Sequence, residues 1–466
     1  MQNVKNKEGK MKINVEELRK TSRIAIVGHK NADFDCMVSG ILLKYIFDEL
    51  RIPCEFVLQD GLEDPYFKKK VEEVRYPYWY RTGLKKTDRL FLVDHTADYE
   101  QEVIGCFDHH PKQAEISKNY VNKEDKTACA KIILEWGESL GIKIPRELAI
   151  LTIYACYMDS MSFKSSKANP IDKIWCQNRI KECHLDEEEV IDFGYGLTDM
   201  SLPFNEYVRT GTKYYNVAPN QKIGSSYVMV KDDDVNMDLV VRSFEKEISD
   251  ELIAWCFIVN NVEDDRTRIL LITKNYQLEQ VIPKLLGRGK DIIPPVIEYL
   301  NFKNDGTITN LLVNTNTHIA TMESCTSGLI ASNITDYEGA SAILKGSHIT
   351  YSNEAKVMAG VSKNIIDIYG VYSKETAIDM AWNTKRYFNS DIGIGITGSI
   401  GRVDPANKDS ISGVIYYQID MNGKDTPITL KYRNISLDRK ELKQKTVDIV
   451  LATLYTKLCK KLEGEA

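Results

Sequence analysis

The sequence predicts an α/β protein of more than one domain. At 466 residues the chain is too long for one ordinary core. Residues 23–195 alternate short apolar strands with longer amphipathic segments, the pattern of a parallel sheet covered by helices. Residues 196–300 contain further strands and predict a smaller α/β second lobe. After a polar, turn-rich linker at 301–314, glycine, serine and threonine become more frequent, and residues 315–466 predict another α/β domain.

Composition and charge exclude several classes of protein. Hydrophobic residues make up 43% and charged residues 27% of the chain, as in soluble globular proteins. The net charge of −6 gives no general attraction to nucleic acid or to a membrane, and no apolar run reaches the ~20 residues of a membrane span. The ten cysteines form no CxxC pair, which favours free thiols in the cytoplasm. The polar, lysine-rich residues 1–22 predict a disordered extension without a signal peptide.

Metal-capable side chains follow three of the predicted strands. They are His29, Asp33 and Asp35 after the strand 24–27, Asp94 after 90–93, and Asp108, His109 and His110 after 103–107. Open α/β sheets place their ligands at the carboxyl ends of strands, so these residues predict a divalent-metal site. Because carboxylates and imidazoles with no thiolate suit manganese or magnesium, a structural zinc site is not favoured. Asp159 ends another apolar stretch and is either a further ligand or a helix cap.

The motifs HKNADFD, LVDH, DHH and MDS, in this order, resemble those of the DHH phosphoesterases, and most closely the manganese-dependent family II inorganic pyrophosphatases. The resemblance implies two Mn2+ ions, with Mg2+ or Co2+ as alternatives. It assigns His29 and Asp33 to one ion, Asp35, His109 and Asp159 to the other, and Asp94 to both. It also implies that His110 faces the phosphate and that Asp108 orients the histidines. In the second lobe, Lys213, Arg288 and Lys290 resemble basic residues that hold the substrate.

Three segments of the last domain predict a hydrolytic site. Ser324 lies in ESCTSG (323–328) at a strand-to-helix turn, where backbone N–H groups can hold an oxyanion. A serine there more often only caps the helix, but TYSNEAK (350–356) supplies a lysine that can act as its base. TGSIG (397–401) predicts a backbone nest for phosphate.

Together these segments resemble the C-terminal domain of the competence/damage-inducible protein A (CinA) family, which includes amidohydrolases of nicotinamide mononucleotide. The resemblance implies that Ser324 is the nucleophile, Lys356 its base and Tyr351 an assisting hydroxyl. Thr326, Thr397 and Gly398 would bind the substrate. Ser327 and Ser399 depart from the usual glycine-rich motifs of the family.

We therefore expect a cytoplasmic, bifunctional hydrolase of small molecules: pyrophosphate or a nucleotide in the DHH module, and nicotinamide mononucleotide in the CinA-type module. One alternative is a nucleotide phosphodiesterase. Another is a nucleotide-sensing regulatory protein in which one module retains its fold but not its catalysis. No membrane or nucleic-acid partner is expected, and a homodimer is left open.

Overall fold

The computed structural model describes residues 13–110, 119–165, 167–232, 234–433 and 438–464. It divides into two compact units, Met1–Leu197 and Thr198–Ala466. The predicted α/β fold is confirmed: the first unit contains a parallel sheet, and the second contains a mixed one.

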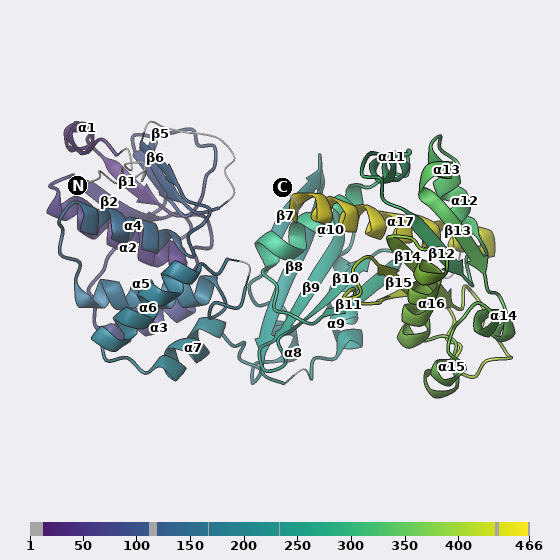
Figure 1. Cartoon of the computed structure of the whole chain (residues 1–466). Coiled ribbons are helices and arrows are strands. Elements are labelled where there is room, and N and C mark those ends of the chain that lie inside the picture. The colour runs from purple at the N-terminus through teal and green to yellow at the C-terminus, as the bar shows by residue number, and fades with distance from the viewer. Residues whose placement is uncertain (1–12, 111–118, 166, 233, 434–437, 465–466) are drawn as a thin grey trace, which may run out of the picture. The chain divides into compact units, whose positions relative to one another are not determined.

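The first unit is built on a six-stranded parallel sheet with the strand order β3-β2-β1-β4-β5-β6 (Figure 1). The strands are β1 (Ile24–Val27), β2 (Cys54–Leu58), β3 (Arg81–Thr82), β4 (Arg89–Val93), β5 (Glu102–Asp108) and β6 (Asn119–Asn122). This order places β1, β4 and β5 side by side. Because the strands are parallel, their carboxyl ends share one edge of the sheet.

Helices cover one face of this sheet (Figure 1). They are α1 (Val15–Lys20), α2 (Phe34–Glu49), α3 (Pro65–Val74), α4 (Cys129–Ser139), α5 (Arg146–Asp159), α6 (Pro170–Glu182) and α7 (Glu187–Tyr195). Helix α2 contacts the sheet, α4 and α5, so it is buried on nearly all sides rather than amphipathic. Helix α1, with Leu18 buried, lies within the segment expected to be disordered, and residues 1–12 of that segment lie outside the described residues.

The second unit contains one ten-stranded sheet, in the order β13-β12-β14-β15-β16-β11-β10-β9-β8-β7. Its strands are β7 (Lys213–Ala218), β8 (Gln221–Val230), β9 (Leu252–Asn261), β10 (Arg266–Thr273), β11 (Tyr276–Ile282), β12 (Ile319–Glu323), β13 (Leu344–Ile349), β14 (Ile392–Gly398), β15 (Val414–Asp420) and β16 (Ile428–Tyr432). Strand β11 pairs with β16, with Tyr276 opposite Tyr432. The predicted second lobe and the predicted last domain therefore share a continuous sheet.

Helices lie on both faces of the ten-stranded sheet (Figure 1). They are α8 (Phe204–Tyr207), α9 (Met237–Phe244), η1 (Glu245–Glu247), η2 (Arg288–Ile292), α10 (Ile293–Asn301), α11 (Thr307–Asn314), α12 (Leu329–Thr335), α13 (Ala340–Ile343), α14 (Asn353–Met358), α15 (Lys363–Tyr369), α16 (Lys374–Tyr387) and α17 (Arg439–Gly464). The alternating residues of strand β14 allow helices to pack on both faces. Ile394 and Ile396 belong to the hydrophobic core that also contains residues of α17, whereas Gly393 and Gly395 let α16 approach the strand closely. A Cβ atom at Gly395 would lie 2.3 Å from the Ala377 carbonyl oxygen.

The segment 301–314, expected to be a linker, contains helix α11. Its residues Ile308 and Leu312 are buried in the same core as α17. The apolar residues of this segment therefore lie on the buried face of a helix, and the turn-forming residues come just before that helix.

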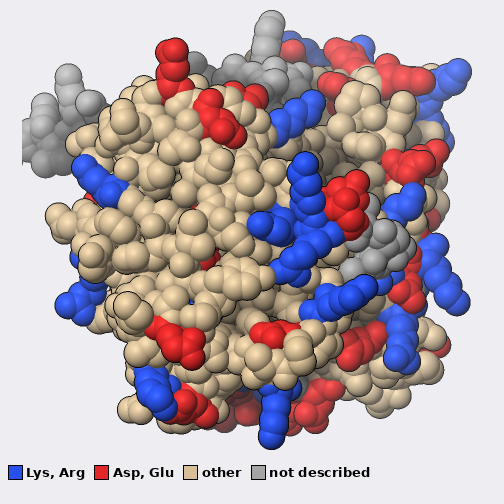
Figure 2. Space-filling view, turned by 90° about the vertical axis from the view of Figure 1, so that its right-hand side faces the viewer, with Lys and Arg blue, Asp and Glu red and all other residues tan. Residues whose placement is uncertain are grey.

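Apolar side chains are exposed on the end of the second unit that carries α14, α15 and α16. Met358, Ile368 and Tyr387 are 89%, 73% and 70% exposed. Figure 2 views this side and shows a broad area with neither acidic nor basic side chains. Among the described residues, no helix combines the length and apolar character needed to cross a membrane.

Candidate functional site

The first candidate site lies at the carboxyl ends of β1, β4 and β5. His29 and Asp33 follow β1, Asp94 follows β4, and His109 follows β5. The chain leaves β4 at Asp94 in the left-handed conformation, with φ 63°. Such a conformation is strained for a non-glycine residue and is held here by the Asp94 N–H, which donates to the Phe107 carbonyl at 2.9 Å. The bend turns the Asp94 carboxylate towards the histidines.

Three groups of side chains in the described part of the chain could hold metal ions. They are His29, Cys36 and Asp94; Asp94, His109 and His110; and Asp35, His109 and Asp159. Within each group the donor atoms lie within 4.8 Å of one another. Asp94 and His109 each belong to two groups. The predicted ligands from three strand ends and from the end of α5 are thus brought together, and Asp33 joins them through His29, whose Nε2 lies 3.5 Å from its carboxylate.

Hydrogen bonds prepare two histidines to act as ligands. Nδ1 of His29 donates to the Lys30 carbonyl at 2.9 Å, and Nδ1 of His109 donates to the Lys126 carbonyl at 3.1 Å. A carbonyl only accepts, so each Nδ1 carries the hydrogen and Nε2 keeps its lone pair in the neutral ring. Within the described residues, His109 Nε2 and Asp94 Oδ1 are buried, 3.3 Å apart, and make no hydrogen bond. Buried polar atoms without a hydrogen-bond partner are well placed to bind a cation.

The electrostatics of the cluster also favour added positive charge. Burial raises the pKa of Asp35 well above its usual range, and the charges of Asp94 and Asp159 add to the shift. Burial opposes protonation of His109, but Asp94 and Asp159 outweigh it and raise the pKa of this residue to about 9.

Lys167, which was not predicted as a site residue, binds both oxygens of Asp159 at 2.8 Å. No motif marks this lysine, because it follows Asp159 across an irregular turn.

Two carboxylates of the cluster also organise the backbone. Asp108 Oδ1 accepts from Nδ1 of His110 at 2.8 Å and from the His109 N–H at 2.8 Å, as expected for a residue that orients histidines. Asp35 accepts from the N–H groups of Cys129 and Ala130 at 2.7 and 3.0 Å, and so caps α4. One residue of the metal motif thereby fixes the first turn of another helix.

The predicted basic residues belong to the second unit. Lys213 begins β7, and Arg288 and Lys290 lie in η2. The Arg288 guanidinium donates to the Gly211 carbonyl and lies 4.9 Å from the centre of the Tyr227 ring. Arg288 is thereby placed near the segment that leads into β7.

The second candidate site is a serine–lysine pair in the second unit. Ser324 follows β12 and Lys356 lies on α14, and their exposed fractions are 4% and 1%. Lys356 Nζ lies 3.0 Å from Ser324 Oγ and donates to the Thr350 carbonyl at 2.9 Å. Burial lowers the pKa of Lys356 to about 8. At physiological pH a much larger fraction of this amine is therefore neutral than of an exposed lysine, and the neutral form can accept a proton.

Glu323 fixes the loop that carries the serine. Its buried carboxylate accepts from the N–H groups of Ile330 and Ala331, at 3.0 and 2.9 Å, near the start of α12. Ser327 then adopts φ 55°, a conformation that favours glycine, at the position where the sequence departs from the family motif. The buried hydroxyl of Thr326 has no hydrogen-bond partner among the described residues.

The other predicted residues of this site, Tyr351, Thr397 and Gly398, have different surroundings. Tyr351 is 61% exposed, and its hydroxyl accepts from Arg439 at 3.0 Å; no hydrogen bond to Ser324 or Lys356 is found among the described residues. The Thr397 hydroxyl donates to the Val371 carbonyl at 2.9 Å. Gly398 has φ 149°, and a Cβ atom there would lie 2.5 Å from the Ile415 Cα.

Arg439 was not predicted. It begins α17 and also donates to the Ile400 carbonyl at 2.6 Å, so it links Tyr351 to the glycine-rich turn. No local motif around Arg439 indicates this contact.

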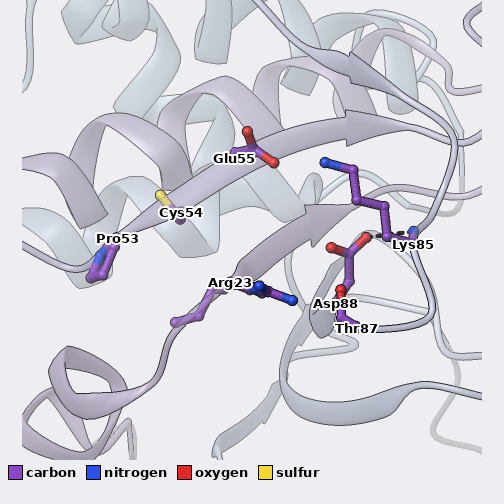
Figure 3. Close-up of a pocket in the computed structure, with 8 residues that line it drawn as sticks. Arg23, Pro53, Cys54, Glu55, Lys85, Thr87 and Asp88 are labelled. Atoms are coloured by element: carbon purple, nitrogen blue, oxygen red, sulfur yellow. Dashed lines mark hydrogen bonds between the residues drawn. The ribbon is translucent and has the colours of Figure 1, made fainter.

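Two cavities lie away from these clusters. One of ≈ 550 Å³ is found at the amino ends of β1, β2 and β4 and is lined by Arg23, Glu55, Lys85 and Asp88 among others (Figure 3). Its lining residues include neither a serine–lysine pair nor one of the three metal-capable groups. A smaller, mainly apolar cavity of ≈ 160 Å³ lies where β10, β11 and β16 meet α10 and α17.

The fold and the two clusters define an α/β protein with a metal-capable centre and a serine–lysine site. Residues 23–156 match the family model of the DHH family, N-terminal domain, and residues 302–458 match that of the CinA C-terminal domain. Residues 23–156 are therefore similar to DHH-family domains, and residues 302–458 are similar to CinA C-terminal domains. The two resemblances predicted from the motifs are confirmed at this level.

Individual relatives match parts of the chain. A competence-damage inducible protein of Clostridium novyi is 37% identical over 164 residues, which are 34% of this chain and 39% of the relative. A CinA-like protein of Fervidobacterium nodosum is 34% identical over 148 residues, 32% of this chain and 35% of the relative. The chain thus spans about two fifths of the length of the curated relatives it matches. A structure from Methanococcus jannaschii described as a family II inorganic pyrophosphatase is 19% identical, covers 59% of this chain and 98% of its own, and has a TM-score of 0.46.

Proposed function

We propose that the DHH-family domain hydrolyses a phosphoanhydride, inorganic pyrophosphate above all, with two divalent cations. The observation that carries the proposal is that three groups of metal-capable side chains are linked by common members, because Asp94 belongs to the first and second groups and His109 to the second and third. Shared ligands hold two cations close together, and such a pair supplies the charge for attack of water on a phosphoryl group. Carboxylate and imidazole donors suit Mn2+, with Mg2+ or Co2+ as alternatives.

The protein's own residues take distinct parts in this proposal. Asp94 would contribute to both cation positions, with His29 and Asp33 at one position and Asp35, His109 and Asp159 at the other. His110, whose side chain is 44% exposed, keeps its Nδ1 on Asp108 and presents Nε2 to the phosphate. Lys213, Arg288 and Lys290 add cationic contacts to phosphate oxygens, each worth about 1.5–3 kcal/mol.

The test is phosphate release from pyrophosphate, tripolyphosphate, dinucleotides and 3′-phosphoadenosine 5′-phosphate, with and without Mn2+. We expect metal-dependent turnover of pyrophosphate that Asp94→Ala abolishes, because both cation positions lose a ligand. Asp98→Ala, an exposed carboxylate four residues further along the chain, is the matched control and should retain activity. Turnover of a nucleotide substrate alone would favour a phosphodiesterase, and binding without turnover would favour a regulatory role. Undiminished activity of Asp94→Ala would contradict the shared site.

We propose that the CinA-type domain deamidates nicotinamide mononucleotide to nicotinate mononucleotide and ammonia. The 3.0 Å contact between Lys356 Nζ and Ser324 Oγ supports this proposal. Ser324 Oγ attacks the carboxamide carbon as its proton passes to Lys356, and N–H groups near Cys325 and Thr326 stabilise the oxyanion. Lys356 then gives the proton to the departing ammonia, and water hydrolyses the ester. The resemblance also implies that Tyr351 assists the proton transfer, which requires its hydroxyl to move from its contact with Arg439. Thr397 and Gly398 would shape the phosphate end of the site.

Ammonia release from nicotinamide mononucleotide tests this assignment. Ser324→Ala and Lys356→Ala should each nearly abolish it, and the double variant should be scarcely worse, because the two residues act as a unit. A chelator should inhibit phosphate release and leave ammonia release intact. Robust ammonia release by Ser324→Ala, or its loss with chelator, would overturn the mechanism.

We further propose a cytoplasmic homodimer. All ten cysteines are free thiols, as expected in a reducing compartment. The exposed Met358, Ile368 and Tyr387 offer an apolar surface for a second copy. Sedimentation equilibrium of the intact chain should show a dimer that Met358→Glu weakens, and a monomer at micromolar concentration would refute it.

A further inference from the structure

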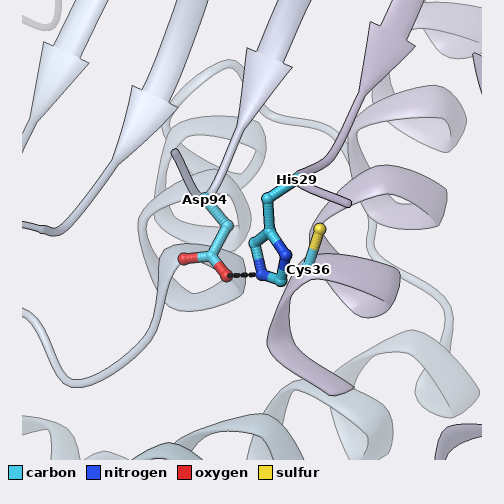
Figure 4. A group of neighbouring side chains, drawn as sticks. All are labelled: His29, Cys36 and Asp94. Carbon is cyan, nitrogen blue, oxygen red and sulfur yellow. Dashed lines mark ion pairs between the residues drawn. The ribbon is translucent and has the colours of Figure 1, made fainter. Parts of the chain in front are cut away.

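A thiol lies inside the metal-capable cluster. Cys36 is in the first turn of α2, and its sulfur, an imidazole nitrogen of His29 and a carboxylate oxygen of Asp94 all lie within 4.8 Å of one another. Figure 4 shows the sulfur beside the imidazole ring, with the Asp94 carboxylate on the other side of the ring. The predicted ligands include only oxygen and nitrogen donors, because Cys36 lies just outside the motif HKNADFD (29–35).

The position of the sulfur is fixed by its surroundings. Cys36 is fully buried, and its backbone N–H donates to Asp33 Oδ1, the side chain that caps α2, at 3.2 Å. On the opposite side the sulfur packs against Gly28, where a Cβ atom would lie 2.1 Å from Sγ. A glycine at the end of β1 therefore makes room for the sulfur next to the cluster.

Buried polar atoms indicate that a cation belongs in the group next to this place, where Asp94 Oδ1 faces His109 Nε2 at 3.3 Å. Asp94 Oδ1 and His109 Nε2 are buried, with residue exposures of 2% and 6%, and have no hydrogen-bond partner in the described part of the chain. Asp94 is also the residue shared between the group that contains Cys36 and the neighbouring group. A cation bound by Asp94 and His29 would lie among donor atoms that include the sulfur.

We propose that Cys36 is a sulfur ligand of the cation held by His29 and Asp94, and that this position selects a borderline cation of the Co2+ or Zn2+ class. The inference rests on the proposed metal centre. On binding, the thiol proton passes to solvent and the sulfur lone pair forms the metal–sulfur bond. The group of Asp35, His109 and Asp159 offers only oxygen and nitrogen, which suit Mn2+. The two positions of the centre therefore differ in metal preference.

Titration of the metal-free intact chain with Co2+ tests the proposal without reference to activity. Bound cobalt should give an intense near-ultraviolet thiolate-to-metal absorption that Cys36→Ser removes. Cys106→Ser is the matched control, because Cys106 on β5 is as deeply buried as Cys36, donates to the His95 carbonyl and belongs to none of the three groups. In competition assays Cys36→Ser should lose tenfold or more in affinity for Zn2+, with a much smaller change for Mn2+.

Each outcome decides a specific point. Bound cobalt without the sulfur absorption, or an absorption that persists in Cys36→Ser, would overturn the thiol ligand and leave the proposed centre standing. Failure of any divalent cation to bind would overturn both. If Cys36→Ser does not fold, X-ray absorption of the Zn2+-loaded wild type replaces it: a sulfur scatterer at ~2.3 Å supports the proposal, and oxygen and nitrogen scatterers alone refute it.

Discussion

Lys356 shows how burial changes the chemistry of a single residue. An exposed lysine is protonated at neutral pH and cannot act as a base. Here burial lowers the pKa to about 8, and Ser324 Oγ lies within hydrogen-bond distance. The fold thereby brings the pKa of this amine close enough to physiological pH to populate its neutral form, which the proposed reaction needs.

The rate of ammonia release should therefore depend on pH. Below about pH 8 Lys356 is protonated and cannot take the serine proton, so kcat should rise with pH and level off above this value. Lys356→Arg, which stays charged, should be at least about a hundredfold slower at every pH. Lys363→Arg is the control, since Lys363 is exposed and paired with Asp367 on α15. A flat profile between pH 6 and 9 would contradict the role of Lys356 as the base.

At the scale of an element, Glu323 couples strand β12 to helix α12. Its two oxygens are taken up by backbone N–H groups of α12, so the strand end and the helix start are held together around Ser324. A carboxylate at this place also stabilises the positive end of the helix. The serine is thus positioned by its neighbour in sequence through a contact with the next helix.

Glu323→Ala should lower the free energy of unfolding by about 1–3 kcal/mol, because buried N–H groups lose their acceptors. Glu323→Gln retains one acceptor oxygen and should fall between alanine and wild type. Urea unfolding followed by circular dichroism measures the change, and ammonia release reports the position of Ser324. Glu338→Ala, an exposed glutamate, should change stability by less than about 0.5 kcal/mol. Equal stability of Glu323→Ala and wild type would show that the cap is unimportant.

At the scale of the whole molecule, the pairing of β11 with β16 joins two parts of the second unit. Five residue pairs, from Tyr276 with Tyr432 to Gln280 with Ile428, connect the strands. Helix α11 adds Ile308 and Leu312 to the core that α17 covers. The CinA-type domain therefore shares a sheet and part of its core with residues that precede it.

A fragment of residues 315–466 should be less stable than one of residues 198–466. The shorter fragment loses α11 and exposes the edge of β16, which invites aggregation. We expect the longer fragment to unfold in one cooperative urea transition and the shorter one to unfold at lower urea or to aggregate on size exclusion. Equal midpoints for two monomeric fragments would show that the β11–β16 pairing contributes little.

The sequence by itself determined the local features of this protein. Alternating apolar strands and helices predicted the α/β class, and polar residues at strand ends predicted that His29, Asp94 and His109 lie close together. The position of Ser324 at a strand-to-helix turn was also predicted, because such a turn is encoded by residues close together in the chain.

The tertiary structure decided what depends on contacts between distant segments. Strand order β1-β4-β5, which no local propensity specifies, places the metal-capable side chains at one edge of the sheet. The packing of α2 against Gly28 brings the Cys36 sulfur into the cluster, and the start of α17 brings Arg439 to Tyr351. The pairing of β11 with β16 is another contact between segments that are distant in the sequence. These contacts arise from the way whole elements pack, and that packing is set by the summed burial of many side chains rather than by any short motif.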